Sequence, residues 1–178
     1  MPKPKETLGV ELTAPYPEIC VLEPNQEYAG MMLDNMGGCN SEMSAVALYF
    51  YDYLVTKDAF EELSGLFHQI NMVEMHHLEI FGTLALKLGA DPRLWTPCKQ
   101  GHEYWIPGYL KYPREIKELV CHAVASEKQA VKKYLRQAQV IGDRHIVANL
   151  TRIIEDEQRH IEALSCWCRA NLEPSFSL

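Results

Sequence analysis

Residues 74–77 are Glu-Met-His-His and residues 157–160 are Glu-Gln-Arg-His, so a glutamate is followed three positions later by a histidine at two places in the chain. Three residues of an α-helix turn through about 300° and rise by about 4.5 Å, which places each glutamate beside its histidine on one face. Each pair can therefore hold one metal ion. A chain with seven histidines should show roughly one such pair by chance, so a single copy would carry little weight.

Two more glutamates stand upstream of these pairs in matching contexts. The stretches around Glu42 and Glu127 both follow the pattern Ser-Glu-x-x-Ala-Val-x-x-Tyr. The first of them lies 32 positions before Glu74, and the second lies 30 positions before Glu157. The chain therefore contains an internal repeat, in which each half supplies a single glutamate and a Glu-x-x-His pair. Two copies in register are much harder to obtain by chance than one.

A predicted turn lies nearly midway between the two glutamates of each half, at Thr56–Asp58 in the first half and at Gly142 in the second. On either side of each turn, 15 to 17 residues of helix span roughly 22 to 25 Å. The helix that leads away from one glutamate is therefore about as long as the helix that returns to the next. All four glutamates and both histidines can meet at one level in the core of a bundle.

The apolar periodicity predicts an all-α protein, a four-helix bundle made of two antiparallel helix pairs. The first helix comprises residues 25–55, where Gly37-Gly38 is a weak point at which the helix can kink. The second helix, residues 59–88, begins after a capping box formed by Asp58 and Glu61 and ends before a glycine.

The second helix pair comprises residues 113–140, with Pro113 as a favourable first residue, and residues 143–170, for which Asp143 is the N-cap. A crossover loop at residues 89–113 joins the two pairs. This loop is longer than adjacent helices need, and its length suits a connection that runs along the bundle. No alternation of apolar and polar residues of useful length predicts a strand.

The remaining segments flank the bundle. Residues 1–24 contain five prolines, which exclude a helix and predict an extended N-terminal arm that either dangles or wraps a neighbouring molecule. Residues 25–171 form the predicted bundle, and residues 172–178 form a C-terminal tail. The arm and the methionine-rich start of the first helix favour a homo-oligomer, with a dimer as the expected form.

The composition excludes several kinds of partner. The formal charge of −7 provides no basic surface for nucleic acid or anionic lipid. The longest apolar run, residues 45–51, is far shorter than the roughly 18 residues of a membrane-spanning helix. The first seven residues contain no apolar segment of the kind found in a signal peptide. We therefore expect a cytoplasmic protein that binds neither nucleic acid nor membrane.

The types of the candidate ligands limit which metal ions the site can bind. The six cysteines are scattered and form no Cys-x-x-Cys pair, so we expect reduced thiols and no cysteine metal site. Four carboxylates and two imidazoles without thiolates suit two iron ions or two manganese ions that share bridging glutamates. The alternative is a bundle with buried Glu–His pairs and no metal. The apolar neighbours of Glu42 count against this alternative, because burying an unpaired carboxylate among them would cost several kcal/mol.

The sequence resembles the ferritin-like superfamily, and within it the rubrerythrin-like proteins, over about residues 25–170. The likeness is carried by four motifs: Ser41-Glu42-x-x-Ala45, Glu74-x-x-His77-Leu78-Glu79, Glu127-x-x-Ala130 and Asp156-Glu157-x-x-His160-Ile161-Glu162. This resemblance implies that Glu74 and Glu157 bridge the two metals. It assigns the other ligands in pairs: Glu42 with His77 on one metal, and Glu127 with His160 on the other.

The first helix pair also resembles that of manganese catalases, through Met32-Leu33-Asp34-Asn35-Met36-Gly37-Gly38 and residues 74–79. The metal is therefore iron or manganese. The sequence departs from rubrerythrins proper in two ways. It lacks the two Cys-x-x-Cys pairs of a rubredoxin-like module, so an electron donor would be external. Ala130 stands where rubrerythrins carry an additional glutamate, and this difference counts against the redox-linked exchange of ligands that the family shows.

Three further residues are predicted to orient the ligands. Tyr49 and Tyr134 lie about two helical turns after the single glutamates, so their hydroxyls can bond to ligand carboxylates. Asp156 resembles the family aspartate that accepts the imidazole N–H of the opposite histidine, here His77. Val73 occupies the matching place in the other half and cannot do the same for the second histidine. The remaining histidines are expected to be surface or core residues.

The resemblance implies redox chemistry on hydrogen peroxide or dioxygen, with two iron ions or two manganese ions per chain. We expect a rubrerythrin-like peroxidase or oxidase that takes electrons from an external donor. Two alternatives would use the same centre. One is peroxide dismutation, as in manganese catalases, and the other is ferroxidase activity in an iron-storage cage.

Overall fold

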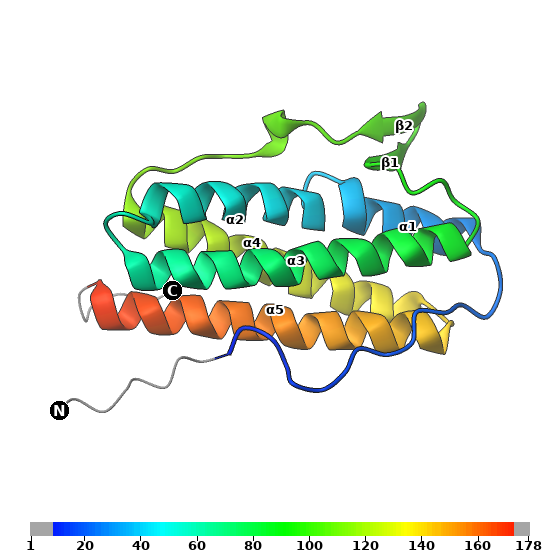
Figure 1. Ribbon diagram of the computed structural model, residues 1–178. Coiled ribbons are helices and arrows are strands. Elements are labelled where there is room, and N and C mark those ends of the chain that lie inside the picture. Colours follow the sequence, from blue (N-terminus) through cyan, green and yellow to red (C-terminus); the bar gives the residue numbers. More distant parts are fainter. Residues whose placement is uncertain (1–8, 173–178) are drawn as a thin grey trace.

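The computed structural model describes residues 9–172. Within this range five α-helices form an antiparallel four-helix bundle, in which two consecutive short helices take the place of one long helix (Figure 1). The helices are α1 Gln26–Gly37, α2 Glu42–Thr56, α3 Glu61–Lys87, α4 Ile116–Val140 and α5 Arg144–Asn171. Helices α1 and α2 follow each other along α3, and α4 pairs with α5, so the predicted all-α four-helix bundle is confirmed. None of the helices in this range is long and apolar enough to cross a membrane. Residues 1–8 of the predicted arm and residues 173–178 of the predicted tail lie outside the described residues.

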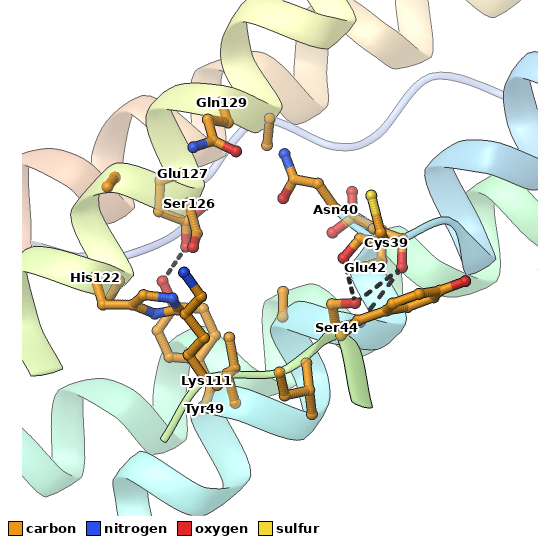
Figure 2. A pocket seen from close by; sticks show the side chains of 18 of the residues that line it. Cys39, Asn40, Glu42, Ser44, Tyr49, Lys111, His122, Ser126, Glu127 and Gln129 are labelled. Carbon is orange, nitrogen blue, oxygen red and sulfur yellow. Dashed lines mark hydrogen bonds between the residues drawn. The ribbon is translucent and has the colours of Figure 1, made fainter. Parts of the chain in front are cut away.

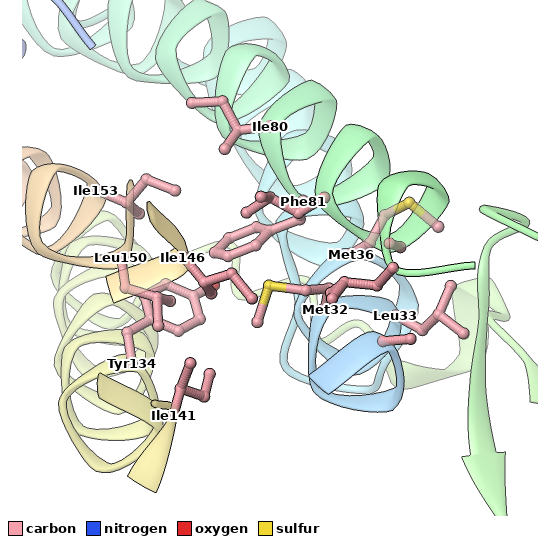
Figure 3. Close-up of a cluster of buried hydrophobic side chains, with 14 of the residues drawn as sticks. Met32, Leu33, Met36, Ile80, Phe81, Tyr134, Ile141, Ile146, Leu150 and Ile153 are labelled. Atoms are coloured by element: carbon pink, nitrogen blue, oxygen red, sulfur yellow. The ribbon is translucent and has the colours of Figure 1, made fainter. Parts of the chain in front are cut away.

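Two clusters of buried apolar side chains make up the core, one toward each end of the bundle. Along α3, the buried apolar residues up to Val73 belong to one cluster, and those from Ile80 onward belong to the other. Along α5, the change of cluster falls between Ile154 and Ala163. Figure 3 shows the cluster to which α1 contributes, where side chains converge from several helices. The two Glu-x-x-His pairs lie in the gaps between the clusters.

Residues 25–55 form two helices rather than the single predicted helix, because the backbone becomes extended at Gly38. A Cβ at this position would lie 2.6 Å from the backbone oxygen of Asp34, so the chain needs a glycine to make the turn. Ser41 then begins the next helix, because its hydroxyl accepts the N–H of Ser44. The predicted weak point is therefore a complete break.

The break between α1 and α2 is bridged from two sides. Lys133 of α4 donates hydrogen bonds to the backbone oxygens of Asp34 at 3.3 Å and Asn40 at 2.7 Å, one before the break and one after it. The crossover packs so closely on the end of α1 that a Cβ at Gly37 would lie 2.8 Å from the backbone nitrogen of Trp95. These contacts keep both helices in place along α3 (Figure 1).

The crossover contains an antiparallel hairpin that the sequence pattern did not predict. Strand β1 is Trp95–Cys98 and strand β2 is Gly101–Tyr104, and a 3₁₀ helix, η1, follows at Pro107–Tyr109. Strands of four residues are too short to show an alternating pattern, and a proline within β1 argues against a strand. The expectation of a crossover without strands is therefore wrong.

The predicted start of the second helix is also wrong. Helix α3 begins at Glu61, and Phe60 at its N-cap makes no side-chain cap, so the predicted capping box with Asp58 does not form. The backbone N–H of Phe60 instead bonds to the carbonyl of Thr56 at 2.8 Å. The connection is thus a tight backbone turn at the end of α2, which leaves Asp58 outside the helix.

The other helix ends give mixed results. Helix α4 begins at Ile116, three positions after Pro113, because the chain is still extended just before this point. Asp143 caps α5 as predicted and accepts the N–H of His145 at 2.9 Å. Gly89 follows the end of α3 with a φ of 96°, a left-handed conformation that favours glycine.

Residues 9–24 of the predicted arm are extended and run along α5 of the same chain (Figure 1). The backbone N–H of Leu22 donates to Oδ2 of Asp143 at 2.7 Å. Nη2 of Arg152 donates to the carbonyl of Leu12 at 3.0 Å. This part of the arm therefore packs on its own bundle, which corrects the expectation that it dangles or wraps a neighbour.

Candidate metal centre

The structure brings all six predicted ligands together, and each of them is buried. They form two overlapping groups, in which one possible ligand atom of each residue lies within 4.8 Å of the others. The groups are Glu42, Glu74, His77 and Glu157, and Glu74, Glu127, Glu157 and His160. Glu74 and Glu157 belong to both groups, which is the arrangement expected of residues that bridge two ions.

Both histidines direct Nδ1 toward the carboxylates. Nδ1 of His77 lies 3.3 Å from Oε2 of Glu74 and 3.3 Å from Oε1 of Glu157. Nδ1 of His160 lies 3.0 Å from Oε1 of Glu74 and 3.0 Å from Oε2 of Glu157. Each histidine thus faces both shared glutamates. In each ring, Nδ1 is the nitrogen available to a metal.

The outer nitrogens of the two rings have different surroundings. Nε2 of His77 lies 3.4 Å from Oδ2 of Asp156, in the place expected for this aspartate. Nε2 of His160 is buried and has no hydrogen-bond partner among the described residues. Val73, which matches Asp156 in the other half of the repeat, offers no side-chain acceptor.

Two buried tyrosines hold the unshared glutamates. The hydroxyl of Tyr49 on α2 donates to Oε1 of Glu127 on α4. The hydroxyl of Tyr134 on α4 donates to Oε1 of Glu42 on α2. Hydrogen bonds from these hydroxyls to carboxylates of the set were predicted, and the structure shows that each one links the two halves of the repeat. The bonds fix the orientation of both unshared carboxylates.

Three residues around Asp156 were missed by reasoning from the sequence. The hydroxyl of Tyr16 donates to Oδ2 at 2.6 Å, the N–H of Leu12 donates to Oδ1 at 2.9 Å, and Arg152 forms an ion pair with Oδ2. Arg152 lies four positions before Asp156 on α5, and this spacing was a usable signal. The arm has no periodic pattern, so nothing in it marked which side chains would reach the bundle.

The contacts around Asp156 keep its carboxyl group ionised. Burial alone would raise the pKa of Asp156. Hydrogen bonds from His77, Arg152 and Tyr16 outweigh burial and hold this pKa below its usual range. An ionised Asp156 accepts the Nε2–H of His77, which leaves the lone pair of Nδ1 free for a metal.

The four glutamates form a crowded set of negative groups. Removal from water raises the pKa of Glu42 and that of Glu127, and the neighbouring carboxylates raise both further. Burial would also raise the pKa of Glu74 and that of Glu157, but hydrogen bonds from the two histidines lower both. Buried carboxylates this close together repel each other unless protons or cations compensate them.

The residues present fit two divalent metal ions. Oε1 of Glu74 and Oε1 of Glu157 are buried and have no hydrogen bond of their own within the described part of the chain. Each lies beside a histidine Nδ1 that bonds to Oε2 of the other shared glutamate. The negative charge of four carboxylates balances two divalent cations, and two neutral imidazoles complete a donor set of the kind that iron and manganese prefer. All six donors stand on long helices, which hold them in place.

A cavity of about 350 Å³ opens on the centre between α2 and α4 (Figure 2). Glu42 and Glu127 line it from opposite sides, whereas the shared glutamates and the two ligand histidines do not. Residues 109–111 of the crossover and His122 of α4 also line it. Asp52 lines the same cavity, and its Oδ1 has no hydrogen-bond partner among residues 9–172. Burial raises the pKa of Asp52 to about 8.

The family model described as Rubrerythrin matches residues 36–166. The chain belongs to the rubrerythrin family. This rubrerythrin-family chain is also similar to a probable manganese catalase from Clostridium acetobutylicum, with 24% identity over 161 residues that cover 80% of this chain and 71% of that protein. Two crystal structures of KatB, a manganese catalase from Anabaena, match with a TM-score of 0.77 and 20% identity, over 94% of this chain and 84% of theirs. The predicted ferritin-like fold of this chain is therefore confirmed.

The match to the rubrerythrin family has a clear boundary. It spans residues 36–166, which include all six candidate ligands, both tyrosines and Asp156. Leu12 and Tyr16, which contact Asp156, lie outside the matched range. In this rubrerythrin-family protein, the arm therefore adds contacts that the family match does not cover.

Proposed function

We propose that this protein is an enzyme of the manganese catalase type, which converts two molecules of hydrogen peroxide into one dioxygen and two waters. The observation that carries the proposal is the buried set of four glutamates and two histidines, which meets a cavity at its two unshared glutamates. The relatives described as manganese catalases support the choice of peroxide and of manganese.

The proposed ligands divide between the two metal positions as the two residue groups do. Glu74 and Glu157 would bridge the ions. The unshared ligands would be Glu42 and His77 at one position, and Glu127 and His160 at the other. Two manganese ions bound in this way supply a two-electron couple, which takes two electrons from one peroxide and returns them to the next.

The cavity determines where peroxide can approach. Of the six proposed ligands, Glu42 and Glu127 alone line it, so peroxide arrives between them. Tyr134 and Tyr49 hold one oxygen of each of these carboxylates, which keeps them from turning across the approach. Asp52 lines the same cavity, and its Oδ1 has no partner among the residues that the structure describes. This oxygen can accept a hydrogen bond from the entering peroxide.

Protons balance over the full cycle. Oxidation of one peroxide to dioxygen releases two protons, and reduction of the other to two waters consumes two. A group in the cavity that holds a proton between the two steps can therefore pass it from one step to the next. Asp52 lines the cavity and has a pKa of about 8, so it can take up and return a proton near neutral pH.

Membership of the rubrerythrin family favours a second candidate, a peroxidase that reduces peroxide at two iron ions with electrons from an external donor. Ala130 distinguishes the two candidates. It lines the cavity at the position where the resemblance to rubrerythrins places an additional glutamate. Dismutation does not depend on that glutamate, and we therefore place it before the peroxidase reaction.

The test is to measure metal content and dioxygen release on the same preparation. The purified protein is loaded with manganese or iron, freed of excess metal and given peroxide with and without a reductant. We expect about two manganese ions per chain and dioxygen release without a reductant. Turnover that requires iron and a reductant would support the peroxidase instead. Failure to bind either metal would refute the ligand assignment.

Size-exclusion chromatography of the same preparation tests the prediction of an iron-storage cage. A cage would elute at many times the mass of the expected dimer. Elution as a dimer or another small oligomer is the result that the enzyme proposal expects. A cage that retains iron after oxidation would replace this proposal with iron storage.

A further inference from the structure

We propose that residues 9–24 act as a strap that positions His77 through Asp156, and that Tyr16 is the positioning residue of this strap. The strap makes the metal position beside His77 tighter than the position beside His160, so the first ion to bind occupies the His77 side. This inference rests on the proposed metal centre but not on the reaction proposed for it.

The strap contacts Asp156 through both carboxylate oxygens. The backbone N–H of Leu12 donates to Oδ1 at 2.9 Å, and the hydroxyl of Tyr16 donates to Oδ2 at 2.6 Å. Asp156 is fully buried on α5, the helix along which the arm runs. The carboxylate is therefore held by a backbone group and a side chain of the same short segment, which restricts its rotation.

Arg152 fastens the strap to α5. This buried side chain donates to the carbonyl of Leu12 at 3.0 Å and to the carbonyl of Ala14 at 3.3 Å. Its guanidinium lies 4.1 Å from the ring centre of Tyr16, within the range of a cation–π contact, and it also forms an ion pair with Asp156. One arginine therefore links the backbone of the arm, the tyrosine and the aspartate.

The result is a defined environment for the outer nitrogen of His77. Nε2 lies 3.4 Å from Oδ2 of Asp156 and 3.4 Å from the hydroxyl oxygen of Tyr16. The hydroxyl of Tyr16 donates to the aspartate, so Nε2–H faces oxygen acceptors and Nδ1 faces the shared glutamates. A fixed ring with an acceptor behind it binds metal more tightly than a ring without one.

His160 has none of this support. Its Nε2 is buried and without a hydrogen-bond partner among residues 9–172. Val73 stands where the other half of the repeat has Asp156, and among residues 9–172 no hydrogen bond joins the arm to the outer nitrogen of His160. The two rings direct the same nitrogen, Nδ1, toward the same pair of shared glutamates. The proposed difference in metal affinity therefore arises from the groups around the two Nε2 atoms.

The experiment is a titration of the metal-free full-length protein with Mn²⁺. Calorimetry measures the binding steps, and electron paramagnetic resonance distinguishes isolated ions from coupled pairs. We expect two binding steps, and at one equivalent a spectrum of isolated ions rather than of coupled pairs. Tyr16→Phe keeps the ring on Arg152 and removes the hydroxyl. We expect this variant and Asp156→Asn to weaken the first step by about tenfold or more and to leave the second step unchanged.

Tyr28→Phe is the matched control. Its hydroxyl accepts the N–H of Gly142 at 2.9 Å, so the variant removes one bonded hydroxyl far from the ligands. We expect unchanged steps in this variant. Two equal steps in the wild type, or a first step that is the same in Tyr16→Phe and Asp156→Asn as in the wild type, would overturn the strap and leave the centre intact. No Mn²⁺ binding at all would refute the proposed centre itself.

Discussion

The two halves of the candidate centre are alike in the residues that face the metal positions. They differ in the residues around the outer nitrogen, Nε2, of each ligand histidine. Each half supplies one unshared glutamate, one Glu-x-x-His pair and one tyrosine that crosses to the other half. Behind His77 lie Asp156, Arg152 and the arm, whereas the outer nitrogen of His160 has no partner in the described range. The internal sequence repeat therefore produces a symmetric set of donors. A segment outside the repeat, the arm, makes the surroundings of the two histidines different.

The repeat shows where each difference arose. Counting 83 positions back from Asp156 and Arg152 leads to Val73 and Gln69, so the second helix of the first half lacks both groups. A further difference lies on the helices that carry the unshared glutamates. Asp52 has a buried oxygen without a partner in the described range, whereas the counterpart of this residue 85 positions later is Gln137.

The amide of Gln137 is fully engaged, in contrast to the carboxylate of Asp52. It donates to Oδ1 of Asn35 at 2.9 Å and accepts from the amide nitrogen of Asn35 at 2.6 Å. A buried amide pair of this kind serves packing and specificity, because it satisfies both members. A buried carboxylate that faces a cavity without a partner has a cost in stability, and this cost points to use in the chemistry.

The largest effect is expected from breaking what the two halves share. Glu157→Gln removes a carboxylate that belongs to both metal groups. We expect the manganese content to fall below half of the wild-type value and dioxygen release to fall by about a thousandfold or more, because both positions lose a ligand. Elemental analysis and an oxygen electrode measure the two quantities.

Glu155→Gln is the control for this variant, because Glu155 is exposed on the same helix. It should retain the metal content and activity of the wild type. If Glu157→Gln keeps about two manganese ions per chain and most of its activity, Glu157 does not bridge the metals.

The next largest effect concerns the difference between Asp52 and Gln137. The folded protein raises the pKa of Asp52 from 3.8 to about 8, so between these values the folded state holds a proton that the unfolded chain releases. Stability from this group therefore falls as pH rises from about 4 to about 8. We expect Asp52→Asn to be more stable than the wild type by roughly 6 kcal/mol at pH 9 and nearly equal at pH 4.

Urea unfolding at both pH values gives these free energies of unfolding. Asp58→Asn is the control, because it makes the same change at an exposed residue. We expect this variant to unfold at the same urea concentration as the wild type. A constant difference between Asp52→Asn and the wild type across the pH range would contradict the assignment of a raised pKa to Asp52.

A smaller effect tests the symmetry in front of the metals. Tyr49→Phe and Tyr134→Phe each remove one hydroxyl that holds an unshared glutamate. Because the two contacts are equivalent, we expect each variant to lower kcat/KM for peroxide by about tenfold, with the two values within a factor of three. Steady-state kinetics measure this. A large loss in one variant alone would show that the halves already differ at the tyrosines.

The smallest effect is expected from adding the missing group. Val73→Asp with Gln69→Arg gives His160 the helical part of the network that supports His77, but not the arm. We expect the second manganese ion to bind about threefold more tightly and the first to bind as before. Calorimetric titration distinguishes the steps. A gain in the first step instead would mean that the order of filling is opposite to the one proposed.

The ligand set could be predicted from the sequence because each part of it depends on local spacing. The three-residue steps place His77 and His160 beside their glutamates, and turns midway between the glutamates bring the steps to one level. These rules hold within a helix and across a tight connection. Metal ligation by these residues stays a prediction until a metal is bound.

The parts that could not be predicted depend on contacts between distant segments. Gly37-Gly38 marked a weak point, but the contacts that bridge the break come from the crossover and from Lys133, which are far away in the sequence. The position of Tyr16 depends on where an extended segment without periodicity packs. The hairpin strands are too short to carry a pattern of their own. These contacts are tertiary, so no local pattern in the sequence specifies them.

The most direct test of the account is a crystal structure of the manganese-loaded protein with anomalous data at the manganese edge. The account predicts two anomalous peaks about 3.5 to 4 Å apart between Glu74 and Glu157, one beside His77 and one beside His160. At one equivalent of manganese, the peak beside His77 should be the stronger. No peak between these helices, or a single peak at full loading, would contradict the dinuclear centre. Equal peaks at one equivalent would contradict the inequality of its halves.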